Sequence, residues 1–256
     1  MTAFDSAALR AALDPVIAAA LDVEAVERID STNSELLRRA TELPDRLALV
    51  ARIQDAGRGR RGRAWAQGED NLALSLFARL PLPPSALGGL SLTLGVACAQ
   101  ALRAQGAGEV GVKWPNDLLA RDRKLGGLLV ELARPTPHGC EAVIGLGLNL
   151  RLPADADADW IALADLAVPG DRLFWAARMI EALCRAVDRF VADGFAAFVA
   201  SWRALDALDG RSVRVIEAGG EWIGTACGVD ADGALRVRAA DGERRLHSAD
   251  VSLRPA

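Results

Sequence analysis

A segment rich in glycine and arginine near residue 60 is the first part of this sequence that suggests chemistry. Residues 51–65 contain five arginines and one acid, whereas the whole chain of 256 residues is acidic, with 34 Asp and Glu against 30 Lys and Arg. Glycines let the backbone approach a ligand and donate N–H groups to an anion, and arginines bind phosphate through paired hydrogen bonds. The segment is therefore either a site for an anionic ligand or a solvated basic patch for RNA.

A second candidate group lies at a proline turn. In Lys113-Trp114-Pro115-Asn116-Asp117 a strand-like run ends, and an amide and a carboxylate project from the turn that follows. A carboxylate on a rigid turn can orient a ligand or take part in proton transfer. The types and spacing of these residues are compatible with a site but do not specify one.

The next apolar run begins with Lys124 and contains two glycines, Gly126 and Gly127. A lysine at the mouth of an apolar strand suggests an anionic partner, and strand glycines suggest the close approach of a flat ligand. Taken alone, Lys124 is also typical of a charge that only keeps a strand end soluble. Gly145-x-Gly147-x-Asn149 repeats the pattern of strand glycines, which by itself indicates a bulge or close packing.

The common nucleotide loops are not indicated. Residues 57–62 and 106–111 both match Gly-x-Gly-x-x-Gly. This pattern binds a dinucleotide where it follows a strand and opens a helix. No helical pattern follows the first stretch, and the second leads from a helix into a strand. A Walker A loop is absent from the sequence.

The elements that must position these residues are predicted from hydrophobic periodicity. Residues 1–28 are expected to form an amphipathic helix that breaks at Pro15. A capping box, with Thr32 at the N-cap and Glu35 at N3, predicts a helix start. Further expected elements are a helix from 85 to 104 and strands at 47–53, 71–77, 110–114, 124–132 and 141–150.

In the last third of the chain the sequence pattern changes from helical spacing to short alternating runs. Asp171 is expected to cap a long helix, which Gly194 separates from a shorter one. From Gly210 onward, Asp-Gly and Gly-Gly turns separate short alternating runs, a pattern typical of antiparallel hairpins. We therefore predict a main domain over residues 1–209 and a small barrel over 210–256, with strands at 212–217, 221–228, 234–239 and 243–248.

Composition excludes several classes of protein. A net charge of -4 and a pI near 5.4 argue against a general attraction to nucleic acid or anionic membranes. The uncharged window between Arg79 and Arg103 is interrupted by prolines and glycines, which favours a buried helix of a soluble core. Four widely spaced cysteines and two histidines predict neither a disulfide framework nor a structural zinc site, and they suit a cytoplasmic location.

The combination of motifs is more specific than any part. In order along the chain stand Ser31-Thr32-Asn33, Gln54-Asp55-Ala56-Gly57-Arg58-Gly59-Arg60-Arg61-Gly62-Arg63-x-Trp65, Lys113-Trp114-Pro115-Asn116-Asp117, Arg123-Lys124-Leu125-x-Gly127-x-Leu129 and Gly145-x-Gly147-x-Asn149. With these motifs the chain closely resembles the biotin protein ligases, over roughly residues 28–256. The resemblance implies an α+β fold: a central mixed β-sheet with helices, of the class II synthetase-like or biotin/lipoate ligase type, and a C-terminal SH3-like barrel.

The resemblance also implies an ATP-dependent ligase with biotin and ATP as substrates and Mg²⁺ as the accompanying metal. Biotin would become biotinyl-5′-AMP, and a lysine of biotin carboxyl carrier protein, an acetyl-CoA carboxylase subunit, would then accept the biotinyl group. Around biotin it places Ser31, Thr32, Asn33, Gln54, Arg58, Gly59, Arg60, Lys124 and Gly127. Around ATP or the adenylate it places Arg58, Arg60, Arg63, Trp65, Asn116, Lys124 and Asn149, the last as a structural support or an indirect contact.

The expected chemistry agrees with these residue types. A carboxylate must approach a polyphosphate in the first step, and Arg58, Arg60 and Lys124, together with the metal, can offset the repulsion between the two anions. Asp117 is expected to orient the amine of the carrier in the second step, as a positioning group or as a base. A glycine and arginine loop that orders over the intermediate would exclude water from it. The sequence assigns no metal ligands.

The resemblance also bears on the expected partners and on the alternative functions. Residues 1–28 are too few for the winged helix that repressor members carry, so no DNA binding is expected, and no membrane association. Related enzymes include monomers and homodimers, and both states stay open. A lipoate ligase or octanoyl transferase would need a narrow apolar tunnel, and an RNA-binding module would need aromatic residues between the arginines of residues 52–63.

Overall fold

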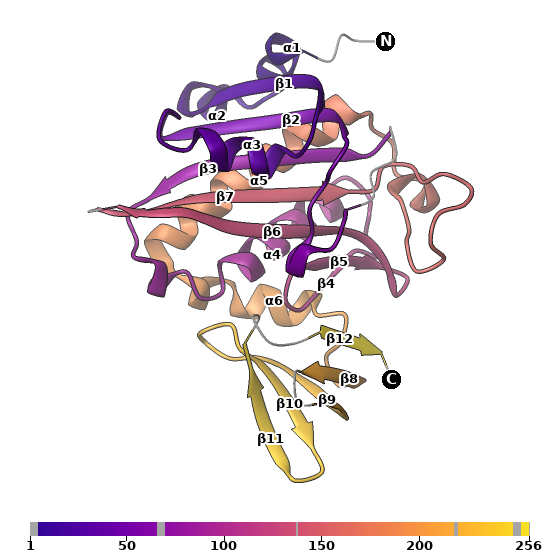
Figure 1. Cartoon of the computed structure of the whole chain (residues 1–256). Helices are drawn as coiled ribbons and strands as arrows, with labels where there is room; N and C mark the ends of the chain where they lie inside the picture. The colour runs from indigo at the N-terminus through magenta and orange to yellow at the C-terminus, as the bar shows by residue number, and fades with distance from the viewer. Residues whose placement is uncertain (1–4, 66–69, 137, 218–219, 248–251, 256) are drawn as a thin grey trace.

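The central element of the computed structural model is a seven-stranded sheet (Figure 1). The structure describes residues 5–65, 70–136, 138–217, 220–247 and 252–255. The strand order is β1-β2-β3-β7-β6-β5-β4; β1 runs parallel to β2, and all other neighbours are antiparallel. The predicted α+β class with a mixed sheet is confirmed. The strands are β1 (Asp22–Ile29), β2 (Arg46–Gln54), β3 (Leu72–Leu80), β4 (Gly111–Lys113), β5 (Asp117–Ala120), β6 (Arg123–Thr136) and β7 (Gly139–Leu148).

The two faces of the sheet enter separate apolar cores, because successive side chains of a strand point to opposite sides. On β2, Ala48 joins the larger core and Leu49 the smaller one. Helices α4 (Leu90–Ala104) and α5 (Arg172–Asp193) supply the larger core, and α3 (Thr32–Arg39) supplies the smaller one on the opposite face (Figure 1).

The face beneath α3 is covered at one end only. Near α3 this face carries Phe77 and Val143, which pack in the smaller core. Further along the same face, β7 carries Gly145 and Gly147, Ser75 of β3 lies opposite Gly145, and Gly127 of β6 lies opposite Gly147. The change from large apolar side chains to glycine and serine leaves this part of the sheet without a packed apolar layer. We call this area the glycine floor.

The N-terminal region is only partly as predicted. Two short helices, α1 (Ser6–Ala11) and α2 (Pro15–Ala20), meet at the break expected at Pro15, where the Asp14 side chain caps α2. Residues 22–28, however, belong to strand β1, so the predicted helix over this stretch is wrong. The alternating segment pairs its backbone with β2, and this tertiary pairing decides its conformation.

The start of α3 is shifted by one residue from the prediction. Ser31 is the N-cap, and its hydroxyl oxygen accepts a hydrogen bond from the Ser34 backbone at 3.4 Å. The predicted N-cap, Thr32, instead donates its hydroxyl to Gln54 Oε1 on β2 at 3.1 Å. Glu35 lies in the first turn, as expected, and pairs with Arg38.

The remaining helices agree with the sequence more closely. Asp171 caps α5 and Gly194 ends it, as predicted. The helix expected from residue 85 begins later, at Leu90, because Gly89 adopts a left-handed φ of 80°. The other helical elements are α6 (Val199–Leu205) and the 3₁₀ turns η1 (Arg60–Gly62), η2 (Pro84–Ala86), η3 (Leu163–Leu166) and η4 (Phe195–Phe198).

A second sheet of five antiparallel strands begins at Ser212 and lies below the main sheet in Figure 1. The four predicted runs correspond to the first four of its strands; β12 and, in the main sheet, β5 were not predicted. The order is β11-β10-β9-β8-β12. The strands are β8 (Ser212–Glu217), β9 (Gly220–Val229), β10 (Leu235–Ala239), β11 (Gly242–Leu246) and β12 (Ser252–Pro255).

The C-terminal sheet contacts the main domain beside the proline turn. Trp114 Nε1 donates a hydrogen bond to the Gly233 carbonyl at 3.0 Å. In the segment that leads into the second sheet, the Ala207 backbone N–H donates to the Val112 carbonyl of β4 at 2.9 Å. The β4–β5 hairpin is therefore braced from two sides.

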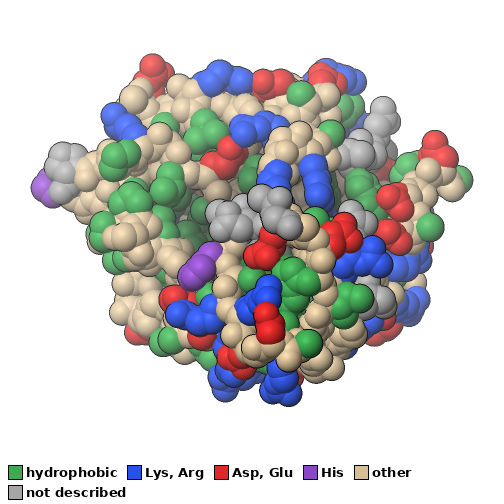
Figure 2. Space-filling model, turned by 60° about the horizontal axis from the view of Figure 1, so that its bottom comes forward, with side chains coloured by type: hydrophobic (Ala, Val, Ile, Leu, Met, Phe, Trp, Pro, Cys, Tyr) green, Lys and Arg blue, Asp and Glu red, His purple; other side chains and the backbone are tan. Residues whose placement is uncertain are grey.

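Basic and acidic side chains are interspersed on the C-terminal side of the molecule (Figure 2). Arg236 pairs with Glu243 at 2.7 Å, and Arg245 pairs with Asp232 at 2.8 Å. Charges of opposite sign therefore offset each other in these pairs. No helix within the described ranges has the length and apolar character needed to cross a membrane.

Candidate functional site

A pocket of about 630 Å³ opens above the glycine floor. Its walls come from the start of α3, the end of β2, the arginine loop, the β4–β5 turn and the segment before Ile161. These segments are far apart in sequence. They contain most of the residues that the sequence marked: Ser31, Thr32, Asn33, Gln54, Arg58, Gly59, Arg60, Arg63, Trp65, Asn116, Asp117, Lys124 and Gly127 all line the pocket.

The glycines are required by neighbouring side chains. A Cβ atom at Gly145 would lie 2.3 Å from Asn33 Oδ1, and one at Gly147 would lie 2.4 Å from the Trp65 ring. At Gly127 the nearest atom would be Asp117 Oδ1, at 3.2 Å. The floor thus gives space to the chain's own polar and aromatic side chains above it. For Gly145 and Gly147 this is the close packing that the sequence allowed, and the approach of a flat ligand over the strands stays a prediction.

One part of the pocket is a cluster of hydroxyl and amide groups. Gln54 Oε1 accepts from the Thr32 backbone at 2.8 Å, and the Ser75 hydroxyl lies 2.7 Å from Thr32 Oγ1. Ser75 also donates to Asn33 Oδ1 at 2.5 Å. Ser31, Thr32, Asn33 and Ser75 are all buried. Such a cluster can match a ligand that offers one strong acceptor and two donors.

Ser75 was not singled out by the sequence analysis. Ser75 is fully buried, and it stands between Leu74 and Leu76 in a strand that is otherwise almost wholly apolar. A polar side chain in a buried strand needs a hydrogen-bond partner, and this requirement is the signal that could have found it.

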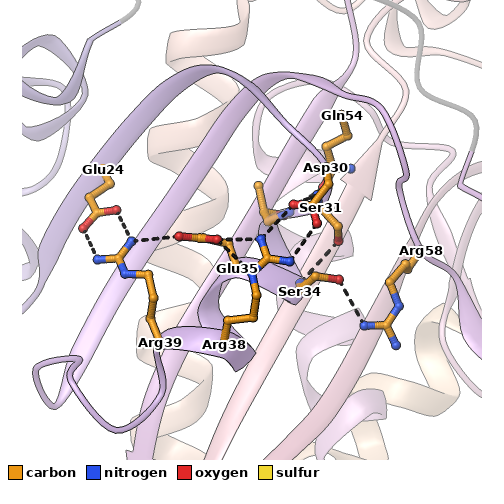
Figure 3. A network of polar contacts seen from close by, with 10 residues as sticks. Glu24, Asp30, Ser31, Ser34, Glu35, Arg38, Arg39, Gln54 and Arg58 are labelled. Carbon is orange, nitrogen blue, oxygen red and sulfur yellow. Dashed lines mark hydrogen bonds and ion pairs between the residues drawn. The ribbon is translucent and has the colours of Figure 1, made fainter.

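The arginine loop is attached to the sheet and to α3. Arg58 Nη2 pairs with Glu131 Oε1 at 2.6 Å, and Nη1 donates to Ser34 Oγ at 3.3 Å (Figure 3). At the base of the loop, Gly59 N donates to Arg63 O at 2.7 Å. Arg58 is therefore held at the rim of the pocket by a carboxylate.

Cations and one carboxylate gather at another part of the pocket. Lys124 Nζ lies 2.7 Å from Asp117 Oδ1, and Lys113 Nζ lies 3.9 Å from Asp117 Oδ2. Arg60 Nη1 donates to Asn116 Oδ1 at 3.3 Å. Burial lowers the pKa of the Arg60 guanidinium, and the neighbouring charge of Arg61 lowers it further. An anion that enters this region would relieve the repulsion among the cations.

Two tryptophans form an aromatic wall beside Lys124. The Trp65 and Trp160 rings stack with centroids 5.7 Å apart and an interplanar angle of 16°. Lys124 Nζ lies 5.5 Å from the Trp65 ring centroid. Backbone bonds hold the segment of Trp160 against the start of β6, with Lys124 N donating to Asp159 O at 2.7 Å. A flat aromatic ligand fits such a wall.

Trp160 was not found by sequence reasoning. It follows a run of alternating Ala and Asp residues that carries no hydrophobic periodicity. The signal available was a large aromatic residue in an otherwise small and acidic loop, which is weak alone.

Asn149 does not line the pocket. Its side chain is fully buried, and Nδ2 donates to the Lys124 carbonyl at 3.3 Å and to the Ile161 carbonyl at 3.2 Å. It thus connects the start of β6 to the segment of Trp160. Of the two roles that the sequence left for Asn149, the geometry favours structural support.

Within the described ranges, no group of three or more His, Cys, Asp and Glu side chains could hold a metal ion. The four cysteines are free, and Cys98, Cys140 and Cys184 are buried. The pocket is lined by six Arg and Lys side chains and four Asp side chains, together with amides and hydroxyls, so its excess of positive charge suits anionic and polar ligands.

Comparisons with known proteins agree with this geometry. Residues 25–149 match the model of the biotin/lipoate A/B protein ligase family, and residues 210–254 match that of the biotin protein ligase C-terminal domain. The chain is 40% identical over 233 residues to the bifunctional ligase/repressor BirA of Escherichia coli, covering 89% of this chain and 73% of that protein. It is 33% identical to the biotin–[acetyl-CoA-carboxylase] ligase of Paracoccus denitrificans, covering 88% of this chain and 97% of that protein.

The fold has solved relatives. The biotin protein ligase from Aquifex aeolicus in complex with biotin and ATP superposes with a TM-score of 0.79 at 24% identity, covering 91% of this chain and 99% of that one. The biotin protein ligase from Leishmania major in complex with biotinyl-5-AMP gives a TM-score of 0.58 at 24% identity, covering 88% and 98%. At this level of identity the superpositions show the fold, and the expected ligase fold with its C-terminal domain is confirmed.

Proposed function

Because this chain belongs to the biotin protein ligase family, we propose that its pocket activates biotin with ATP and transfers the biotinyl group to a lysine of a biotin carboxyl carrier protein. One observation carries the assignment of the site. A buried cluster of hydroxyls and amides and a lysine–carboxylate pair lie along the same glycine floor, in one pocket. A ligand that spans the two would place a polar ring at one and a reacting carboxylate at the other.

The hydroxyl and amide cluster is assigned to the ureido ring of biotin. Ser31, Thr32, Asn33 and Gln54 supply donors and acceptors, and Ser75 fixes the orientation of two of them. Burial makes an unmatched polar group costly, so this cluster favours a ring whose polar atoms match it. Octanoate offers no such atoms, and this argues against octanoyl transfer.

The cations are assigned to the first reaction. An oxygen of the biotin carboxylate attacks the α-phosphorus of ATP, the bond from that phosphorus to the bridging oxygen breaks, and pyrophosphate leaves. Lys124 and Arg60 lie where they can stabilise negative charge on the carboxylate and the α-phosphate. We assign Arg63 and Asn116 to the phosphate and ribose region, because both line the pocket, Asn116 accepts a hydrogen bond from Arg60, and the charge of Arg63 acts on Arg60.

The tryptophan wall is assigned to adenine. Trp65 and Trp160 stack on each other beside Lys124, so an adenine ring that joins this stack would keep its phosphates near the lysine. Mg²⁺ is expected to enter with the nucleotide and to be held mainly by phosphate oxygens, as is common for this ion. It would supply positive charge at the phosphates.

The second reaction is assigned to Asp117. The neutral amine of the carrier lysine attacks the acyl carbon, the bond from that carbon to the AMP oxygen breaks, and AMP leaves as the amine nitrogen loses a proton. Asp117 follows Pro115 and Asn116 on the braced β4–β5 turn, so its carboxylate can orient the amine. We further infer a cytoplasmic location, which suits free and mostly buried cysteines.

Titration calorimetry with biotin, octanoate and a single-stranded RNA tests this function. We expect heat from biotin alone among the three, and biotin-dependent release of pyrophosphate from ATP. A carrier protein added afterwards should gain the mass of one biotinyl group. Binding of octanoate or RNA in place of biotin would overturn the proposal.

A further inference from the structure

Glu131 binds two parts of the proposed biotin site at once. On β6, its Oε1 atom pairs with Arg58 Nη2 at 2.6 Å, and its Oε2 atom accepts from Asn33 Nδ2 at 2.9 Å. The Glu131 side chain is 21% exposed and the Arg58 side chain 44%, so the pair lies at the rim of the pocket. One carboxylate thus connects the arginine loop to a buried amide of the ureido cluster.

The Asn33 end of this connection is rigid. Asn33 is buried, its Oδ1 atom accepts from Ser75 Oγ at 2.5 Å, and its Nδ2 atom also lies 3.3 Å from the Leu129 carbonyl. The lack of a side chain at Gly145 leaves room for this amide. Movement of Asn33 would therefore disturb Glu131, because few other orientations of the amide keep all of these hydrogen bonds.

The Arg58 end lies at the base of the loop. Arg58 forms an isolated bridge with Ala64, which closes the loop, and it also donates to Ser34 on α3 (Figure 3). The loop between these two residues carries Arg60 and the 3₁₀ turn η1. Fixing Arg58 fixes where this loop leaves the sheet.

We propose that Glu131 is a positioning residue that couples recognition of biotin at Asn33 to closure of the arginine loop through Arg58; this inference rests on the proposed function. A ligand that holds Thr32 and Asn33 in place also holds the Glu131 carboxylate in the orientation that binds Arg58. Since energetic coupling between two sites is reciprocal, a closed loop in turn strengthens the grip on biotin. A half-exposed ion pair with no such connection would leave biotin binding unchanged.

The test uses Glu131→Gln, which keeps the shape of the side chain and its hydrogen bond with Asn33 but removes the charge that holds Arg58. Its matched control is Glu109→Gln, because Glu109 forms an exposed pair with Arg121 at 2.7 Å outside this pocket. The readouts are biotin affinity by calorimetry and the rate at which trypsin cuts after the arginines of residues 58–63, identified by fragment mass.

We expect Glu131→Gln to bind biotin about three- to tenfold more weakly, as for the loss of a partly exposed charged hydrogen bond. Biotin should slow loop cleavage in the parent and in Glu109→Gln, but much less in Glu131→Gln. The double variant Arg58→Ala/Glu131→Gln should be no weaker than the worse single variant, because both changes remove one connection.

Parent-like affinity and cleavage in Glu131→Gln would overturn the inference, as would fully additive effects in the double variant. Trypsin cleavage of the arginine loop in the absence of biotin tests this inference independently of the proposed function. The Arg58–Glu131 pair is formed without biotin, so its effect on the loop can be measured without biotin. If the ligand-free variant is cut faster than the parent, Glu131 holds the loop. If the parent then fails to bind biotin, the proposed function is overturned instead.

Discussion

The Nζ atom of Lys124 and the Oδ1 atom of Asp117 lie 2.7 Å apart above Gly127. Both side chains are mostly shielded from solvent, with 31% and 18% of their surfaces exposed. The proposed catalytic cation therefore has an anionic partner before any substrate binds. A substrate anion must compete with Asp117 for Lys124, and once it succeeds the carboxylate is available to an incoming amine. This relationship makes the two residues separable by experiment.

Lys124→Ala should strongly reduce biotin-dependent release of pyrophosphate. Removal of one group positioned to stabilise charge in a transition state typically costs about 10²–10³ in rate. Arg123→Ala is the matched control, because Arg123 precedes Lys124 on β6 and donates to the Ala158 carbonyl instead of lining the pocket. Both variants need thermal melts. A folded Lys124→Ala protein with the parent rate would contradict the assignment.

Asp117→Asn should affect the second step more than the first. The charge of Asp117 helps neither anion during adenylation, and its loss frees Lys124 from a competing partner. We expect most of the pyrophosphate release to persist, and transfer from preformed biotinyl-AMP to the carrier to fall by at least about tenfold, as for loss of a positioning contact. Quenched-flow assays of each half-reaction measure this. Equal losses in both steps would instead show that Asp117 positions Lys124.

The sequence was most informative where motifs lie on strand ends. Lys124, Gly127 and Asp117 were expected in one site, and the register of β5 with β6 pairs Asp117 with Gly127. This outcome follows from short connections, because residues at a hairpin turn and at the start of the next strand must be neighbours in an antiparallel sheet. Their roles in the reaction are still predictions.

Contacts between distant segments could not be predicted. Trp160 meets Trp65 across 94 intervening residues, and Glu131 meets Arg58 across the sheet. In both pairs, the sequence around each residue does not indicate which residue it contacts. The misassigned strand β1 has the same cause, because its conformation depends on parallel pairing with β2. Local periodicity contains no information on such pairings.

Gly145→Ala should weaken biotin binding by displacing Asn33. The added Cβ would lie 2.3 Å from Asn33 Oδ1, so the buried amide must move and lose its bonds with Ser75 and Glu131. Loss of buried hydrogen bonds of this kind corresponds to about tenfold or more in affinity. Gly108→Ala is the control, because open space surrounds that position. Calorimetry showing the parent affinity in a folded Gly145→Ala protein would contradict the role of this amide.

Asp206→Asn should stabilise the protein at neutral pH and leave its stability unchanged in acid. Asp206 lies where the chain passes from α6 to the second sheet. Its Oδ2 atom is buried, and its contact with the Trp202 side chain does not have the geometry of a hydrogen bond. Burial raises the pKa of this carboxyl to about 6, and the charge of Asp209 adds to the increase.

The direction of this pH dependence follows from how many protons the folded and unfolded states of the parent bind. Between the unfolded pKa of 3.8 and the folded value of about 6, the folded state of the parent binds more protons, so its stability falls as the pH rises through this window. A pKa shift of this size corresponds to at most about 3 kcal/mol in the free energy of unfolding.

The side chain introduced by Asp206→Asn carries no charge and can keep the hydrogen bond that Oδ1 of Asp206 accepts from Leu208 N at 2.9 Å. Urea unfolding should therefore show Asp206→Asn to be more stable than the parent at pH 8 and equal to it near pH 4. The exposed neighbour provides the control, Asp209→Asn, which should show a much smaller difference between the two pH values. A gain in stability that is the same at both would mean that Asp206 is ionised throughout, and that something other than its charge destabilises the parent.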